Sequence, residues 1–395
     1  MVIIMKILLI NVSARNGSVG RIVASLYNGL KARGNEVKVA YGRGDVGDIQ
    51  SKDAYKIVTD FEVRIHALCS RLAGGSAIYY SKRATKKLIK WIDNYNPDVI
   101  SIHGAYGYYL NMPILYSYIA KQRKQCYVTL HSCWDFTGHC CYFDLNECYK
   151  WKEGCHQCHN LHEYPKACFF DNTHRNWKIK RELYNSIDKC TIIAPSNWIA
   201  EYAKKSFLKD KKIVVINNGI DLSVFHKIER KKYVRPRILC IANVWDRRKG
   251  LRDVIELAKY AENKIELVVI GLSEKQLKEL PDNVTGVQRT NNVEELIEYY
   301  NNSTVLFNPT YEDNYPTVNL EAIACHLPVI TYDTGGCRET IKNGKYGVIV
   351  NKRDYEHVLN IVHCIFDGKM TFDYTDIGFL NQTYMVENYS HIFSR

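Results

Sequence analysis

The sequence predicts an α/β protein built from two doubly wound, Rossmann-like domains that face each other across a cleft. Its 395 residues are enough for two or three domains, because one domain usually holds about 100 to 200 residues. Short β-branched runs alternate with amphipathic stretches, which is the pattern of parallel sheets covered by helices. The polar stretch 221–236, with the basic cluster Arg230, Lys231 and Lys232, separates two series of these runs. We therefore interpret it as a linker.

Each series of apolar runs is expected to supply the strands of one sheet. The first series comprises residues 7–12, 37–40, 99–103, 126–130 and 190–194; the second comprises 238–242, 265–270, 284–287, 305–308, 329–332 and 348–350. We expect a first domain over 1–218, a second over 219–375, and a C-terminal helix in 376–395 that packs back on the first domain. Ligands of such sheets bind beyond the carboxyl ends of the strands, so each domain would bind one substrate.

Charge is distributed unevenly along the chain. Residues 1–218 carry 32 basic and 18 acidic side chains, whereas residues 219–395 carry 22 and 24. This asymmetry indicates an anionic partner for the first half, such as nucleic acid, an anionic membrane surface or a phosphorylated substrate. The apolar runs are shorter than the roughly 18 residues that a membrane span needs, and Lys6 interrupts the N-terminal run, unlike a signal peptide. We expect a cytoplasmic protein.

The loop after the first predicted strand has the composition of a phosphate-binding turn. Residues 16–21 include Gly17, Ser18 and Gly20 and precede an amphipathic stretch. Small residues there allow the backbone amides at a helix start to approach a phosphate. A tight turn between strand and helix accounts for the glycines equally well.

The second half places cations, a helix start and a carboxylate after its strands. Arg248 and Lys249 follow the strand at 238–242, where they would neutralise a pyrophosphate leaving group. A helix beginning near Thr317 and Val318 would offer free amides to a diphosphate. Glu321, one turn later, can accept two hydrogen bonds from a ribose diol. These groups suit different parts of a nucleotide sugar.

Together, these segments resemble the family 4 retaining glycosyltransferases of the GT-B fold. The resemblance covers nearly the whole chain and rests on the order of its motifs: 16–20, 129–131, 195–198, 218–221, 248–250, the acidic residues 313 and 321, and 334–336 before 339. The segment 131–140 is similar to the subset that builds bacterial capsular and surface polysaccharides. The resemblance implies transfer, with retention, from a nucleotide-sugar donor to a lipid-linked or oligosaccharide acceptor.

The resemblance also implies roles for single residues. Lys249 matches the lysine that holds the donor diphosphate, Glu321 the glutamate that binds the ribose, and His131 the histidine near the reacting sugar. Asp313 stands where the family usually has a glutamate that contacts the transferred sugar, and Glu312 beside it is the alternative. His131 ends a predicted strand, so capping of that strand is its other interpretation. The implied mechanism is front-face attack, with the proton passing to a donor phosphate oxygen and no catalytic metal.

Two positions depart from the family pattern. The arginine expected six residues before Lys249 is Asn243, and Arg248 or Arg247 are the candidate replacements. The glycine expected after Cys325 is His326. We expect a helix end there with a positive φ, a conformation that histidine tolerates better than β-branched residues.

Eight of the 14 cysteines fall between residues 126 and 168, which indicates a Cys-rich insertion at 133–168. Its spacing predicts one structural zinc held by four thiolates; free core thiols and disulfides are the alternatives. The candidate ligands, called here the four-cysteine set, are Cys140, Cys148, Cys155 and Cys158.

A basic amphipathic helix is predicted shortly before the strand at 99–103. Its basic side chains are Lys82, Arg83, Lys86, Lys87 and Lys90, and its apolar face holds Tyr80, Ala84, Leu88, Trp91 and Ile92. One interpretation is a helix that covers the sheet, with its apolar face in the core and its lysines in solvent. The other is a helix through which the protein binds peripherally to the inner face of the cell membrane.

Two other functions compete with the transferase. One is a zinc-ribbon protein that binds nucleic acid, although the chain shows no RNP-type strand, recognition helix or KH-type loop, so no nucleic-acid partner is expected. The other is a different GT-B enzyme such as a sugar epimerase.

Overall fold

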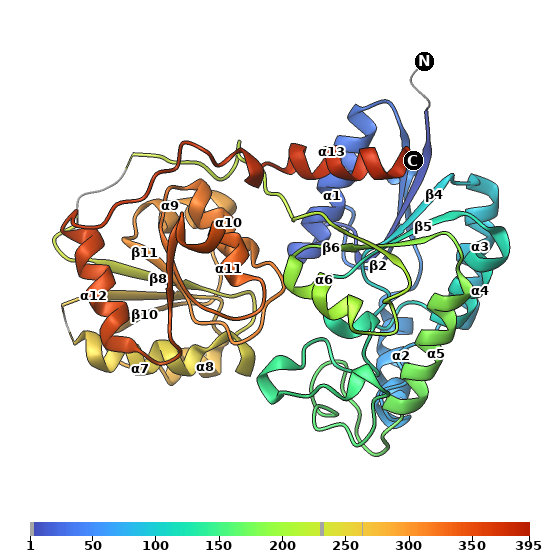
Figure 1. Cartoon of the computed structure of the whole chain (residues 1–395), viewed down its shortest axis with the longest axis horizontal. Coiled ribbons are helices and arrows are strands. Elements are labelled where there is room, and N and C mark those ends of the chain that lie inside the picture. The colour runs from blue at the N-terminus through green and yellow to red at the C-terminus, as the bar shows by residue number, and fades with distance from the viewer. Residues whose placement is uncertain (1–3, 230–232, 263) are drawn as a thin grey trace. The chain divides into compact units, whose positions relative to one another are not determined.

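The computed structural model describes residues 4–229, 233–262 and 264–395. The chain forms two units (Figure 1), one comprising Met1–Asn217 with Met385–Arg395 and the other Asn218–Tyr384. The chain therefore leaves the first unit after Asn217 and returns to it at Met385, nine residues later than the expected boundary at 376.

The first unit is built around a seven-stranded parallel sheet in the order β3-β2-β1-β4-β5-β6-β7. Its strands are β1 (Lys6–Ser13), β2 (Glu36–Arg43), β3 (Ala54–Lys56), β4 (Val99–Ile102), β5 (Gln125–Thr129), β6 (Cys190–Ala194) and β7 (Lys212–Val215). Its helices are α1 (Gly17–Ala32), α2 (Asp60–Leu72), α3 (Lys82–Tyr95), α4 (Met112–Gln122), α5 (Thr173–Ser186), α6 (Asn197–Lys204) and, from the chain end, α13 (Gln382–Phe393).

The second unit contains a six-stranded parallel sheet in the order β10-β9-β8-β11-β12-β13. Its strands are β8 (Arg237–Ile241), β9 (Glu266–Ile270), β10 (Val284–Val287), β11 (Val305–Asn308), β12 (Val329–Tyr332) and β13 (Gly347–Val350). Its helices are α7 (Leu251–Ala261), α8 (Glu274–Lys278), α9 (Val293–Asn301), α10 (Thr317–Ala324), α11 (Cys337–Thr340) and α12 (Tyr355–Phe366). Two doubly wound α/β units confirm the predicted fold class.

Alternation along β1 explains how one sheet acquires two covered faces. Ile7 and Leu9 enter the apolar core that α1 and α13 share, whereas Leu8 and Ile10 enter the core under α3 and α4. Successive strand residues point to opposite faces, so a continuous apolar run requires helices on both sides. The C-terminal helix packs closely on α1, because a Cβ added at Gly29 would lie 2.7 Å from the Val386 side chain.

The predicted linker at 221–236 was placed wrongly. Within it, Phe225 is buried in the core of the second unit, and Leu222, Val224 and Ile228 pack against that core. The segment is polar in composition, but these side chains anchor it. Arg230, Lys231 and Lys232 lie outside the described residues.

The predicted basic amphipathic helix is confirmed as α3. Ala84, Leu88 and Ile92 are buried in the core of the first unit, while the five basic side chains named above are exposed. The apolar face of α3 is thus used for packing. Within the described ranges, none of the helices is both long enough and apolar enough to cross a membrane.

Candidate active site

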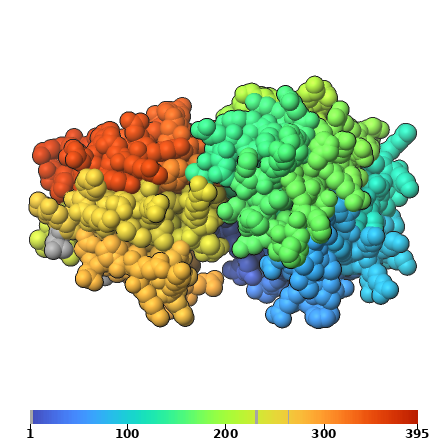
Figure 2. Space-filling view, turned by 90° about the horizontal axis from the view of Figure 1, so that it is seen from below, coloured from blue at the N-terminus to red at the C-terminus, as the bar shows by residue number. Residues whose placement is uncertain are grey.

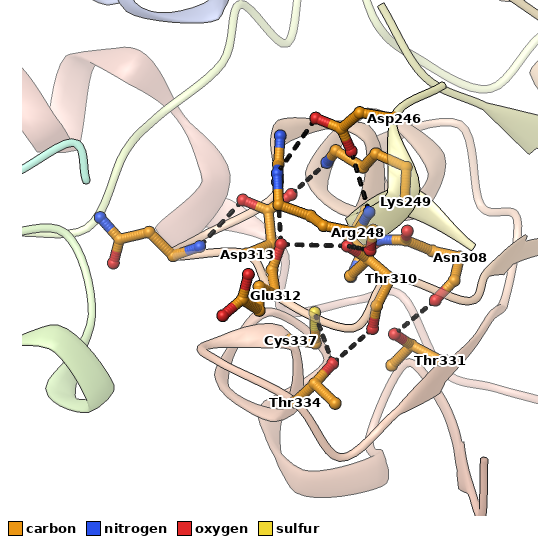
Figure 3. A network of polar contacts seen from close by, with 12 residues as sticks. Asp246, Arg248, Lys249, Asn308, Thr310, Glu312, Asp313, Thr331, Thr334 and Cys337 are labelled. Atoms are coloured by element: carbon orange, nitrogen blue, oxygen red, sulfur yellow. Dashed lines mark hydrogen bonds and ion pairs between the residues drawn. The ribbon is translucent and has the colours of Figure 1, made fainter. Parts of the chain in front are cut away.

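Three loops of the second unit meet where β8, β11 and β12 end, and Figure 3 shows the polar contacts among them. Tyr311 N donates to Arg248 O at 2.7 Å, and Thr334 Oγ1 donates to Thr310 O at 2.6 Å. Because these strands are neighbours in the sheet, their carboxyl ends lie at one edge. The loops are fixed to one another through backbone carbonyls, and charged side chains from two of them pair with each other.

A lysine and a carboxylate are paired in this loop cluster. Lys249 Nζ lies 2.5 Å from Asp313 Oδ2, with 17% and 14% of the two side chains exposed, and Arg248 Nη1 donates to Glu312 O at 2.8 Å. Burial opposes ionisation of Asp313, but the positive charges of Lys249 and Arg248 hold the pKa of its carboxyl below the usual value. Two cations therefore stand after β8, and each has a carboxylate partner: Lys249 pairs with Asp313, and Arg248 Nε lies 3.4 Å from Asp246 Oδ2.

Helix α10 begins beside this pair and carries the second carboxylate. Its N-cap is Pro316, which supplies no side-chain cap for the amides of the first turn, where Thr317 and Val318 lie. Glu321 is buried with 2% of its surface exposed, and its Oε2 accepts a hydrogen bond from Tyr300 OH at 2.8 Å. The tyrosine fixes the orientation of the carboxylate. Sequence reasoning did not identify Tyr300, which comes from α9 and carries no motif.

Two glycines allow the loops to approach this closely. Gly335 has φ +55°, and a Cβ there would lie 1.8 Å from Asp313 O; Gly336 N donates to the same carbonyl at 3.0 Å. Gly250 has φ +78°, and its Cβ would lie 2.2 Å from Pro309 O. Any other residue at these positions would push the backbone of the acidic loop away.

The first unit contributes a pair of buried histidines. His131 follows β5, and its Nε2 lies 3.2 Å from Nδ1 of His103, which follows the neighbouring strand β4. His103 Nε2 lies 3.1 Å from Ser101 Oγ. Burial lowers the pKa of His131 to about 3, and burial and then the neighbouring His131 lower the pKa of His103. Both imidazoles are therefore neutral near pH 7.

His103 was missed by the sequence reasoning, although it ends one of the apolar runs. One signal in the sequence could have identified it. His103 follows β4 and His131 follows β5, so the two histidines stand at the same ends of neighbouring strands. Tyr389, from α13, stacks on His103 with ring centroids 5.9 Å apart and shares a hydrogen bond with Thr129. Only folding brings this tyrosine to the pair, because it lies near the end of the chain.

The glycine-bearing loop forms the start of α1, as expected. Gly17 adopts φ +76°, and Asn16 at the N-cap makes no side-chain cap hydrogen bond. A Cβ at Gly20 would lie 2.4 Å from the Arg15 carbonyl carbon, so the turn requires a glycine there. Gly17 and Ser18 thus lie at the carboxyl end of β1, in the same unit as His131.

The predicted helix end with a positive φ is also confirmed. His326 follows α10 with φ +55°, and its ring stacks on Tyr374 with centroids 4.7 Å apart. The stacking helps to hold a conformation that glycine adopts freely.

The cysteine-rich insertion brings part of the four-cysteine set together. Cys140 and Cys158 have sulfur atoms 3.8 Å apart, which is about the separation of two thiolates bound to one tetrahedral zinc ion. Gly138 N donates to Cys155 Sγ at 3.1 Å, and Asn160 Nδ2 lies 3.4 Å from Cys140 Sγ. Among the residues described, no group of three or more His, Cys, Asp or Glu side chains is arranged to hold a metal. The four-ligand site stays a prediction.

Comparison with known proteins identifies the family. Residues 235–367 match the model described as "Glycosyl transferases group 1", and residues 17–224 match "Glycosyltransferase Family 4". The putative colanic acid biosynthesis glycosyl transferase WcaC of Escherichia coli is 27% identical over 260 residues, which cover 62% of each chain. The N,N'-diacetylbacillosaminyl-diphospho-undecaprenol alpha-1,3-N-acetylgalactosaminyltransferase of Campylobacter jejuni is 27% identical over 41% of this chain and 48% of its own.

The fold agrees with these matches. The structure of sucrose-phosphate synthase from Thermosynechococcus elongatus aligns with a TM-score of 0.69 over 99% of this chain and 98% of that one, at 18% identity. The family 4 model alone spans more than half of the sequence. The chain therefore belongs to glycosyltransferase family 4.

Proposed function

We propose that the protein is a retaining glycosyltransferase of surface polysaccharide biosynthesis. It would move a sugar from a nucleotide-sugar donor to a lipid-linked or oligosaccharide acceptor. The observation that carries the proposal is the loop cluster of the second unit, in which the Lys249–Asp313 ion pair lies in the loops next to the start of α10, the helix that holds Glu321. This cluster offers cations, helix amides and carboxylates within one set of adjoining loops.

Each part of the donor has a partner in this cluster. Lys249 and Arg248 would bind the diphosphate, together with the amides of Thr317 and Val318 at the helix start. Arg248, which already reaches the acidic loop, is our choice for the cation that replaces the arginine expected at Asn243. When a diphosphate arrives, Lys249 can exchange the Asp313 carboxylate for phosphate oxygens.

The released carboxylate then has a role of its own. Asp313, or Glu312 beside it, would accept hydrogen bonds from hydroxyls of the transferred sugar, and Glu321 would accept them from the ribose. Within the first unit, Gly17 and Ser18 at the start of α1 would offer backbone donors to a donor phosphate. Carboxylates would thus contact the sugar and the ribose of the donor, while the cations contact its diphosphate. This assignment would account for carboxylates in a site for an anionic ligand.

His131 would position the reacting sugar or the acceptor as a neutral imidazole. With a pKa of about 3, it is not an imidazolium acid at neutral pH, so it would act through a hydrogen bond. We propose front-face attack, in which the acceptor hydroxyl approaches from the side that the diphosphate leaves and a donor phosphate oxygen takes the proton. The protein would contribute positioning and charge stabilisation, without a catalytic metal.

The names of two relatives support the acceptor that we propose. The names of the two relatives refer to colanic acid and to an undecaprenol diphosphate carrier, so a polysaccharide intermediate on a lipid is the favoured acceptor. Such an acceptor would bring a cytoplasmic enzyme to the inner face of the cell membrane as a peripheral protein.

A thermal-shift panel of nucleotide sugars tests the donor site. A donor at about 100 times its dissociation constant adds about 2.7 kcal/mol of stability. Lys249→Ala should abolish that shift, whereas Lys259→Ala, which removes an exposed lysine of α7, should retain it. If no nucleotide sugar shifted the parental protein, or if Lys249→Ala responded like the parent, the proposed donor site would be wrong.

A further inference from the structure

Helix α2 exposes a row of large apolar side chains. Phe61, Ile65, Leu68 and Leu72 are exposed by 70%, 45%, 55% and 47%, and their spacing of four, three and four places them on one helical face. The opposite face, with Val63, His66 and Ser70, is buried. The helix is therefore already packed through a different side, and the apolar row is left over.

Two further phenylalanines extend this row. Phe169 and Phe170 are exposed by 72% and 64% in the segment that ends the cysteine-rich insertion. Cys168 N donates to Arg71 O at 2.9 Å, and Asn172 Nδ2 donates to Ala73 O at 2.8 Å, so the segment is tied to the C-terminal end of α2. Figure 2 shows the green surface of the insertion region lying against blue surface from the early part of the chain.

We call these six side chains the apolar strip: Phe61, Ile65, Leu68, Leu72, Phe169 and Phe170. Large apolar side chains that are exposed together in this way mark an interaction site. Scattered single apolar residues would need no explanation, but here they share one helix face and the segment bonded to it.

The charges around the strip favour an anionic bilayer as its partner. Arg64 and Arg71 of α2 and Lys166 of the adjoining segment are exposed beside it. The acidic Glu62 is engaged in the capping box of α2, where Thr59 N donates to its Oε2 at 2.7 Å. A helix that presents bulky apolar side chains flanked by arginines has the composition of an interfacial helix. The basic excess of this half of the chain adds attraction to anionic headgroups.

We propose that the apolar strip inserts into the headgroup region of an anionic membrane and holds the protein there. This inference rests on the proposed function, since a lipid-linked acceptor must be reached at a membrane surface. It assigns the insertion to α2 and the segment 168–170. Helix α3 would add only charge, because its apolar face is buried.

Sedimentation with vesicles tests the proposal. The protein should co-sediment with phosphatidylcholine vesicles that contain phosphatidylglycerol, and less with phosphatidylcholine alone. Replacing Phe61, Leu68 and Phe169 together by Ser should weaken binding on the order of tenfold or more. The control Tyr260→Ser removes an exposed aromatic side chain of the second unit and should bind like the parent.

Three results would overturn the proposal. The first is that the parental protein binds neither vesicle. The second is that the triple variant binds as the parent does. The third is that the strip proves to be a dimer interface: the parental protein forms a concentration-dependent dimer in analytical ultracentrifugation and binds no vesicles, and the triple variant stays monomeric. Donor-induced thermal shifts, measured on the same proteins, separate this inference from the proposed function: the triple variant should retain them, and loss of vesicle binding alone leaves the donor site intact.

Discussion

Replacing His131 by Gln should remove part of the acid sensitivity of the first unit. His131 is buried beside a second histidine, and burial lowers its pKa from the usual 6.5 to about 3. The folded state thus excludes a proton that the unfolded chain binds below pH 6.5. Stability from this group is present above pH 6.5 and is lost as the pH falls from 6.5 toward 3.

The size of the effect follows from the two pKa values. Between pH 7.5 and pH 5.0, the linkage relation gives a loss of about 2 kcal/mol for this single group. In His131→Gln the group that takes up the proton is absent, so the difference in unfolding free energy between parent and variant should change by about 2 kcal/mol across this range. Any loss of the hydrogen bond to His103 affects both pH values equally.

Urea unfolding followed by circular dichroism at the two pH values provides the assay. His363→Gln, at an exposed position of α12, is the matched control and should follow the parent. If His131→Gln were destabilised by the same amount at both pH values, burial would not exclude the proton and the neutral imidazole would be refuted.

The catalytic role of His131 is tested by a different variant. His131→Asn should lower turnover by about one to two orders of magnitude. Unchanged kinetics with a lower melting temperature would indicate a capping role.

Three further predictions concern the donor loops and the cysteines. Lys249→Ala and Glu321→Ala should each lower transferase activity by about a hundredfold or more while the circular dichroism spectrum is retained; parental turnover in either variant would exclude its role. Gly335→Ala should abolish donor binding, because the added Cβ would collide with the Asp313 carbonyl, whereas Gly368→Ala, also at a positive φ but with open space around it, should cost only about 1 kcal/mol of stability and bind donor. Elemental analysis should find about one zinc per chain in the four-cysteine set, and a metal-free, fully active preparation would refute the zinc site.

The strands of both sheets were predictable from the sequence wherever a buried run was long enough. The prediction missed β3 and β7, which lie at the two edges of the first sheet. β3 has only three residues, and β7 is half-buried and begins at Lys212, so neither shows the continuous apolar pattern of a central strand. Hydrophobic runs therefore predict edge strands less well than the central strands of a parallel sheet.

The motif residues of the site were predictable because charged residues follow strands at fixed positions. Their partners were not. In the second unit, Tyr300 reaches Glu321 from α9; in the first unit, His103 and Tyr389 reach His131 and its neighbour from β4 and α13. The apolar row of α2 was missed for a different reason. Its spacing is that of a helix face that packs into a core, and the sequence does not show that α2 buries its other face.

The stereochemistry of the transferred sugar tests the central claim most directly. The donor identified by the thermal-shift panel would be incubated with the protein and an undecaprenol-diphosphate-linked acceptor, and the anomeric proton of the product would be followed by NMR. We predict that the first product formed carries the anomeric configuration of the donor and that Lys249→Ala forms none of it. A product of inverted configuration, or equal turnover by Lys249→Ala, would contradict a retaining transferase built on this loop cluster.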